Sequence, residues 1–173
     1  MAIESYYIRN KIKYHITQLK KLMLLEDIPD EKVDQYYSNV EIHIIEMAAL
    51  TRKLRDLGKL PDNTLEDINV NLIRYTSQGP DSQRSYVDME KEYDLVNPSS
   101  SQLPLSRIVD LIIHSYVLQA SGDEGYAFSH ILVTSDHTRL TGLFSIDLKD
   151  LNDACLRVCV MHTRVQYIPY TIR

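Results

Sequence analysis

The stretch from residue 3 to residue 57 constrains the fold most, because it contains no glycine and a single proline, Pro29. Apolar residues recur along it mostly at spacings of three and four, which places them on one side of an α-helix. Examples are Ile8, Ile12, Ile16 and Leu19 before Pro29, and Val40, Ile44, Met47 and Leu54 after it. The pattern predicts two long helices that pair as an antiparallel hairpin. Such a pair must bury its apolar side against the rest of the chain or against another molecule.

The ends of both helices can be read from the same stretch. We expect the first helix to run from about residue 3 to residue 25. The second begins near Pro29, because proline suits the first turn of a helix and Asp30 suits the positive end of its dipole. Gly58 suits the C-terminal cap of this helix, and Pro61 prevents its continuation.

Beyond Pro61 the sequence changes to alternating polar and apolar residues, which is typical of strands with one buried face. We expect strands over residues 68–75 and 86–96, separated by a turn. Residues 97–101, an Asn-Pro pair followed by three serines, predict a loop. Residues 104–120 predict an amphipathic helix.

The C-terminal part predicts a β-hairpin over residues 126–134 and 139–147, followed by a helical turn and an interior strand over 156–165. A symmetric connection between the two hairpin strands would place residue 130 opposite residue 143. The more apolar face should be the core, and it holds Ile131, Val133, Leu140, Phe144 and Ile146. The polar face includes His130, Ser145 and Asp147.

These elements predict an α+β fold: an N-terminal antiparallel helical hairpin followed by an antiparallel β-sheet of four to five strands with one packed helix. The hairpin comprises residues 1–60 and the α+β sheet region residues 61–173, and we expect them to form one compact domain. Two arrangements stay open at this point. The hairpin either docks on the sheet or projects to pair with a second copy in a homodimer.

Composition excludes several classes of partner. The net charge is −5 and the basic residues are scattered, so binding to nucleic acid is not expected. The apolar runs are far shorter than the ~20 residues of a membrane span, so no membrane partner is expected. The two cysteines form no disulfide framework, and the N-terminus lacks a signal-peptide pattern. We therefore expect a cytoplasmic protein.

Cys155, Cys159 and His162 have the spacing most typical of metal ligands. In a strand the two cysteines would lie about 13 Å apart, with His162 on the opposite face, at ~3.3 Å per residue. One zinc ion could not bind all three side chains there. The five glycines form no phosphate-binding loop. We therefore expect neither a metal nor a cofactor, and we interpret the cysteines as buried apolar residues.

His130, Ser145 and Asp147 contain the residue types of a hydrolytic triad. Such a triad needs its nucleophile on a sharp turn beside an oxyanion donor, and the chain has no Gly-x-Ser-x-Gly motif. We interpret the three residues as part of a partly solvated sheet face.

The spacing of Arg9 and His15 resembles the Arg-x4–6-His motif of HEPN-type ribonucleases, which are helical proteins that cut RNA. The resemblance implies that His15 serves as acid or base while Arg9 stabilises the phosphorane. Arg107 and His114 have the same kind of spacing. The competing interpretation of Arg9 and His15 is a helix-surface arginine and an edge histidine.

Twelve tyrosines, against two phenylalanines and no tryptophan, are the other unusual feature. Adjacent tyrosines cannot both face one core, and tyrosine is enriched where proteins meet. The candidate interface residues are Tyr6, Tyr7, Tyr14, Tyr36, Tyr37 and Arg52.

Two hypotheses for function remain. The first is a non-enzymatic protein-interaction protein of the adaptor, inhibitor or immunity type. It would act through the helical hairpin and an acidic surface, with a basic protein partner and with self-association. The alternative is a small HEPN-like ribonuclease that uses Arg9 and His15.

Overall fold

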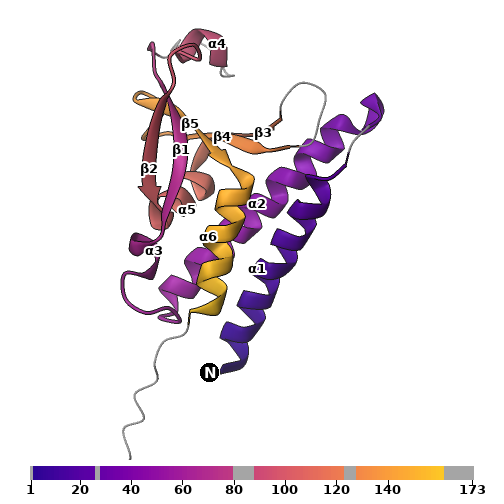
Figure 1. Ribbon diagram of the computed structural model, residues 1–173, viewed down its shortest axis with the longest axis vertical. Coiled ribbons are helices and arrows are strands. Elements are labelled where there is room, and N and C mark those ends of the chain that lie inside the picture. Colours follow the sequence, from indigo (N-terminus) through magenta and orange to yellow (C-terminus); the bar gives the residue numbers. More distant parts are fainter. Residues whose placement is uncertain (1, 26–27, 80–87, 123–127, 162–173) are drawn as a thin grey trace, which may run out of the picture.

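The computed structural model describes residues 2–25, 28–79, 88–122 and 128–161 (Figure 1). The helices are α1 (Ala2–Leu22), a 3-10 turn (Asp30–Lys32), α2 (Val33–Asp56), α3 (Thr64–Asp67), α4 (Met89–Glu92), α5 (Leu105–Ile113) and α6 (Leu148–Val160). The strands are β1 (Asn69–Thr76), β2 (Ser99–Pro104), β3 (Ser115–Ser121), β4 (His130–Ser135) and β5 (Gly142–Asp147). The predicted α+β class, with its N-terminal hairpin and antiparallel sheet, is confirmed.

The helical hairpin forms as the apolar spacing predicts. α1 and α2 lie side by side and antiparallel (Figure 1). α2 ends in the expected glycine cap: Gly58 has a φ of +59°, its N–H donates to Arg55 O, and Lys59 N–H donates to Leu54 O. This pair of bonds is the Schellman motif, which satisfies carbonyls that the last turn of a helix leaves free.

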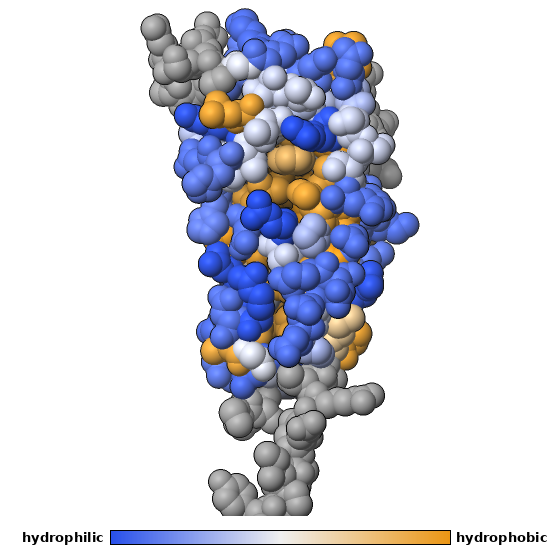
Figure 2. Space-filling view, turned by 90° about the vertical axis from the view of Figure 1, so that its left-hand side faces the viewer, coloured by the Kyte–Doolittle hydropathy of each residue, from blue (hydrophilic) through white to orange (hydrophobic). Residues whose placement is uncertain are grey.

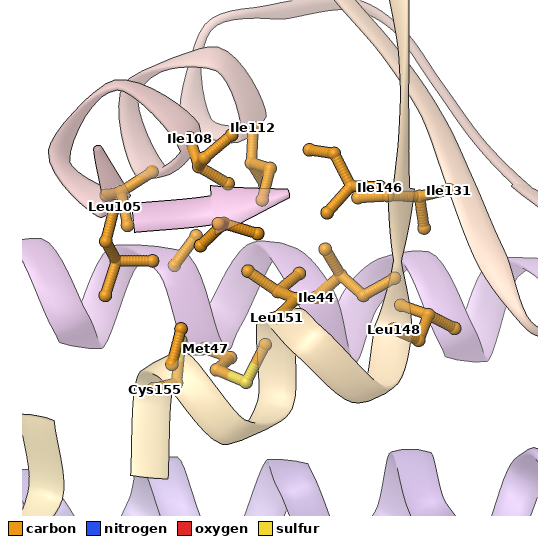
Figure 3. Close-up of a cluster of buried hydrophobic side chains, with 14 of the residues drawn as sticks. Ile44, Met47, Leu105, Ile108, Ile112, Ile131, Ile146, Leu148, Leu151 and Cys155 are labelled. Atoms are coloured by element: carbon orange, nitrogen blue, oxygen red, sulfur yellow. The ribbon is translucent and has the colours of Figure 1, made fainter. Parts of the chain in front are cut away.

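The hairpin docks on the sheet region, which answers the question that the sequence left open. α2 packs against α5, β3 and α6, while α1 packs mainly against α2 and α6 (Figure 1). Buried side chains from α2, α5, α6 and the sheet point toward one another in a single cluster (Figure 3). Its labelled members are Ile44, Met47, Leu105, Ile108, Ile112, Ile131, Ile146, Leu148, Leu151 and Cys155. On the side of the molecule where β2 and α5 lie, hydrophobic residues also reach the surface between hydrophilic ones (Figure 2).

The five strands form one antiparallel sheet in the order β2-β1-β5-β4-β3. β1 confirms the strand predicted near residues 68–75. One face of the sheet carries Val70, Ile131, Val133 and Ile146 and belongs to the core. On the opposite face, Leu143 and Tyr93 are buried outside the main cluster, so the short α4 segment covers one end of that face.

The β4–β5 hairpin has the predicted faces but a different register. His130 lies opposite Asp147, four residues from the predicted partner Leu143. The shift arises because the connection is longer than expected: Arg139 N–H donates to Ser135 O, and Thr138 Oγ1 lies 3.0 Å from Ser135 Oγ. An even shift preserves the faces. The placement of Leu140 in the core was wrong, because it lies in this connection and is 59% exposed.

Three predictions in the middle of the chain were wrong. The helix predicted over residues 104–120 ends with α5, and β3 follows because the edge of β4 needs a hydrogen-bonded neighbour. The serines predicted as a loop form β2, paired with β1. Because β1 already has β2 on one edge and β5 on the other, the segment 86–96 cannot pair along β1, and residues 86 and 87 lie outside the described residues. Its described residues form α4 and a single bridge from Tyr93 to Ser77.

The interior strand predicted over residues 156–165 was also wrong where the structure describes it, because residues 148–160 form α6; residues 162–165 lie outside the described residues. Leu156, Val158 and Val160 alternate with other residues, but buried Leu151, Cys155 and Val158 also recur every three or four residues. Asp147 is the N-cap of α6, and its carboxylate accepts hydrogen bonds from Lys149 N and Asp150 N. This N-cap favours the helix over the strand.

Candidate functional site

Arg9 lies inside the structure and not on the helix surface. Its side chain is 4% exposed, with Nη1 donating to Val158 O at 2.6 Å and Nη2 donating to Lys59 O at 2.8 Å. Nε donates to Ser5 Oγ at 3.2 Å. Val158 belongs to the last turn of α6, whose carbonyls have no partner within the helix. Arg9 therefore caps α6 and ties it to α1, and its pKa is lowered by burial.

His15 forms a pair with His43 across the seam between α1 and α2. Their Nδ1 atoms are 3.1 Å apart, so one ring donates and the other accepts. Glu46 Oε2 lies 4.0 Å from His15 Nε2. Tyr14 makes edge contacts with both rings, at 5.3 Å and 6.3 Å between centroids. The group lies at the outer rim of the seam, where it can exchange protons with solvent.

Burial lowers the pKa of His15. The neighbouring His43 and Lys11 lower it further, whereas Glu46 acts in the opposite direction and raises it. Burial also lowers the pKa of His43, and Glu46 again opposes it. Both rings are therefore neutral at pH 7 and can share one hydrogen bond. The structure thus gives Arg9 and His15 different neighbours: main-chain carbonyls for the first and a second histidine for the other.

The geometric argument against a metal site assumed that Cys155 and Cys159 lie on a strand, and this assumption was wrong. Cys155 and Cys159 lie one turn apart on α6, not on a strand. Both are buried and free, Thr51 Oγ1 donates to Cys155 Sγ at 3.8 Å, and burial raises the pKa of Cys155 to about 12. His162 lies outside the described residues. Within the described ranges, no three His, Cys, Asp or Glu side chains are placed to hold a metal ion.

The six candidate interface residues divide into two groups. Tyr36 and Tyr37 pack on Phe128, at 5.2 Å and 4.5 Å between ring centroids. Arg52 joins α2 to α5, with Nη1 at 3.1 Å from His114 Nε2 and 3.6 Å from Asp110 Oδ1. These three residues contact the chain itself.

Tyr6, Tyr7 and Tyr14 are 69%, 59% and 51% exposed. Tyr7 and Tyr14 are seven residues apart and share one side of α1, with the ammonium of Lys11 at 5.7 Å from each ring. On α2, Ile42 and Ile45 are 53% and 42% exposed. We call Tyr7, Tyr14, Ile42 and Ile45 the hairpin patch.

The outer face of the sheet, opposite the core, is hollowed into an open groove of about 950 Å³. Polar side chains of β1, β2, β4 and β5 line it, together with the first turn of α6. His130 and Asp147 are cross-strand partners, and Ser145 lies beside Ile73 of β1. The groove therefore brings together the three polar residues that the sequence placed on one face.

The sequence did not predict two walls of this groove, which are formed by β2 and by the first turn of α6. Gln102 Nε2 donates to Asn71 Oδ1 at 2.7 Å across β2 and β1, and Asp150 contributes from α6. The serine-rich segment predicted a loop, so nothing indicated that β2 would border β1. The capping role of Asp147 was the available signal for α6, because an aspartate followed by an amphipathic stretch is a helix-start pattern.

Comparison with known proteins adds no assignment. No protein-family model matches the sequence, and searches of curated proteins and of solved structures give no significant match. Among the described residues, no helix is both long and apolar enough to cross a membrane.

Proposed function

We propose that the chain is a non-enzymatic, cytoplasmic protein-interaction protein of the adaptor, inhibitor or immunity type, and that the hairpin patch is its contact surface. The observation that carries the proposal is the exposure of four large apolar side chains on the two helices of the hairpin. Tyr7 and Tyr14 share one side of α1 beside Lys11, and exposed tyrosine is enriched where proteins meet.

Charge complementarity supports a second copy of the chain as the partner of this patch. Besides the buried Arg9, α1 carries four basic residues and one acidic residue. The first part of α2, Val33 to Glu46, carries three acidic residues and no lysine or arginine. In a dimer with twofold symmetry, α1 of each copy would pack on α2 of the other copy. The same contact between α1 and α2 would therefore occur twice in the interface. Lys11 would then approach Glu46 of the other copy.

The area that the hairpin surface offers sets the expected affinity of the dimer. Helices of this length extend ~30 Å at 1.5 Å per residue, and two neighbours about 10 Å apart offer roughly 600 Å². Stable complexes bury about 800 Å² per partner. We therefore expect a reversible dimer, with a dissociation constant on the order of micromolar.

Sedimentation equilibrium over a concentration series tests the proposal. Lys11→Glu and Glu46→Lys should each weaken dimerisation about tenfold, and the double variant should restore it, because opposite charges face each other again. Leu140→Glu is the control, because Leu140 is an exposed apolar residue outside the helical hairpin. This variant should leave the dissociation constant of the dimer unchanged. A chain that stays monomeric at every concentration, or a double variant weaker than both single variants, would contradict the proposed dimer.

The ribonuclease alternative is tested separately. Purified protein and its His15→Ala variant are incubated with single-stranded RNA, and cleavage is followed by gel. We expect no cleavage by either protein. If the unmodified protein cleaves the RNA and the His15→Ala variant does not, the ribonuclease hypothesis replaces the interaction proposal.

A further inference from the structure

We propose that the free edge of β2 binds an extended, basic segment of a partner protein, which adds a further strand to the sheet. β2 is the first strand in the sheet order and lies at the left of Figure 1. The inference deepens the proposed function and rests on it, because it states which chemistry the basic partner has and where it binds. The edge shares no residue with the hairpin patch, so the two contacts can be tested separately.

The main chain of β2 offers hydrogen-bonding groups that β1 does not use. Leu105 N–H donates to Ile68 O at 2.7 Å, and bonded pairs recur at every second residue of an antiparallel ladder. By this alternation Ser101 bonds to β1, whereas Ser100 and Gln102 direct their N–H and C=O groups away from it. Within the described ranges these four groups have no hydrogen-bond partner. Two donors and two acceptors therefore lie along the edge in the pattern that an added strand requires.

The edge of β2 lacks the features that normally protect a sheet edge, namely charges, proline, bulges or a covering helix. Residues 99–103 contain no charged residue and no proline, and their register with β1 has no shift. The opposite edge of the sheet, β3, is covered, because α2 packs against it and Glu41 lies beside the main chain of Ala120. Pro98 and Pro104 flank the free segment and limit an added strand to about five residues.

The turn before β2 adds an apolar contact at one end of this edge. Asp94 N–H donates to Thr76 O at 2.9 Å. Thr76 and Ile68 are separated by an even number of residues, so their carbonyls point to the same edge of β1, and the turn lies beside β2 there. Leu95 and Val96 in this turn are 38% and 86% exposed. Because β2 runs away from the turn, an antiparallel strand would place its C-terminal end against these two side chains.

Charge complementarity at the same end of the edge argues for a basic partner. Residues 88–97 carry four acidic side chains and one lysine, Lys91, whose Nζ lies 2.7 Å from Asp88 Oδ2. Arg74 on β1 donates to Thr141 O and is therefore turned toward β5 and away from β2. An acidic segment would be repelled at this end, whereas arginine or lysine at the end of the added strand would be attracted.

The experiment is a titration of the full, isotopically labelled chain, followed by amide chemical shifts. The probe is the acetylated and amidated peptide Thr-Val-Thr-Val-Thr-Leu-Arg-Arg, in which a strand-forming segment precedes one apolar and two basic residues. One control peptide ends in Glu-Glu, and another has proline at its third and fourth residues, so that it lacks a donor toward either side. We expect amide shifts at Ser100 and Gln102 with the probe, about fivefold weaker binding of the glutamate peptide and no binding of the proline peptide.

Substitutions at two positions of the chain locate the contact. Ser100→Pro removes an outward N–H but no bond to β1, and edge strands tolerate proline at such positions. It should weaken binding of the probe about tenfold, whereas the matched variant Ser100→Thr keeps the N–H and should leave binding unchanged. Asp94→Asn keeps the oxygen that accepts from Val96 N and Asn97 N but removes the charge, so it should weaken binding about twofold. Asp153→Asn, at an exposed position of α6, is its control and should bind the probe normally.

Absence of shifts at Ser100 and Gln102, equal binding of the proline peptide, or equal affinities of Ser100→Pro and Ser100→Thr would overturn the proposal. The proline peptide tests the main-chain contact without altering the protein, so the test does not depend on the folding of Ser100→Pro. Weaker self-association of Ser100→Pro in sedimentation would assign the edge to a second copy and would also overturn the proposal. Lys11→Glu should bind the probe as the unmodified chain does, so that failure of the hairpin dimer is recognised separately.

Discussion

Replacing Arg9 by methionine should lower the free energy of unfolding by about 2–4 kcal/mol. The substitution removes the donors of two hydrogen bonds, to Val158 O at 2.6 Å and to Lys59 O at 2.8 Å. Hydrogen bonds from a charged donor contribute ~1.5–3 kcal/mol each, and both carbonyls lie at element ends where no other partner replaces the guanidinium. The cost of burying the charge, which also lowers the pKa of Arg9, offsets part of the sum.

Urea unfolding at pH 7, followed by circular dichroism at one protein concentration, measures this difference. Arg157→Met, on the exposed side of α6, is the control and should change stability by less than ~0.5 kcal/mol. Arg9→Lys keeps the charge but loses the fork that reaches both carbonyls, so we expect an intermediate loss of about 1–2 kcal/mol. If Arg9→Met costs no more than Arg157→Met, the capping role that we infer from the contacts is refuted.

Three further predictions concern the interior and the histidine pair. Asn152 is fully buried and neither of its amide atoms has a hydrogen-bond partner among the described residues, so Asn152→Leu should raise stability by ~1 kcal/mol in urea; a loss above ~2 kcal/mol would contradict this. A Cβ at Gly142 would lie 2.8 Å from Tyr75 O, so Gly142→Ala should lower the melting temperature and cost about 1–3 kcal/mol, whereas an unchanged melting temperature would show that the strands can separate. The pKa values of His15 and His43 are lower in the folded state than their ordinary value of 6.5, so the unfolded chain binds more protons and stability should fall as the pH drops below 6.5. His15→Gln combined with His43→Gln should flatten this part of the pH profile measured by urea unfolding, and an unchanged slope would exclude the pair as its cause.

The sequence determined the helical hairpin because its signals are local. The spacing of Ile8, Ile12 and Ile16 marks the buried side of α1, and Gly58 provides the left-handed cap that ends α2. The same holds for β1 and for the faces of the β4–β5 hairpin, since alternation decides which side chains share a face whatever the register. Of the candidate interface residues, the sequence indicated that some tyrosines must be exposed, but not that Tyr36 and Tyr37 would pack on Phe128.

Only the tertiary structure decided the elements whose patterns fit two conformations. Residues 115–121 continue the apolar pattern of a helix, yet they form β3 because β4 offers a free edge. The serines of β2 carry no strand signal, and their pairing with β1 builds one wall of the groove. α6 could be read as a strand until its N-cap, its packing on α1 and its bond from Arg9 are seen together. Local periodicity determines which face a side chain takes, whereas partners distant in sequence determine which element forms and which polar groups meet.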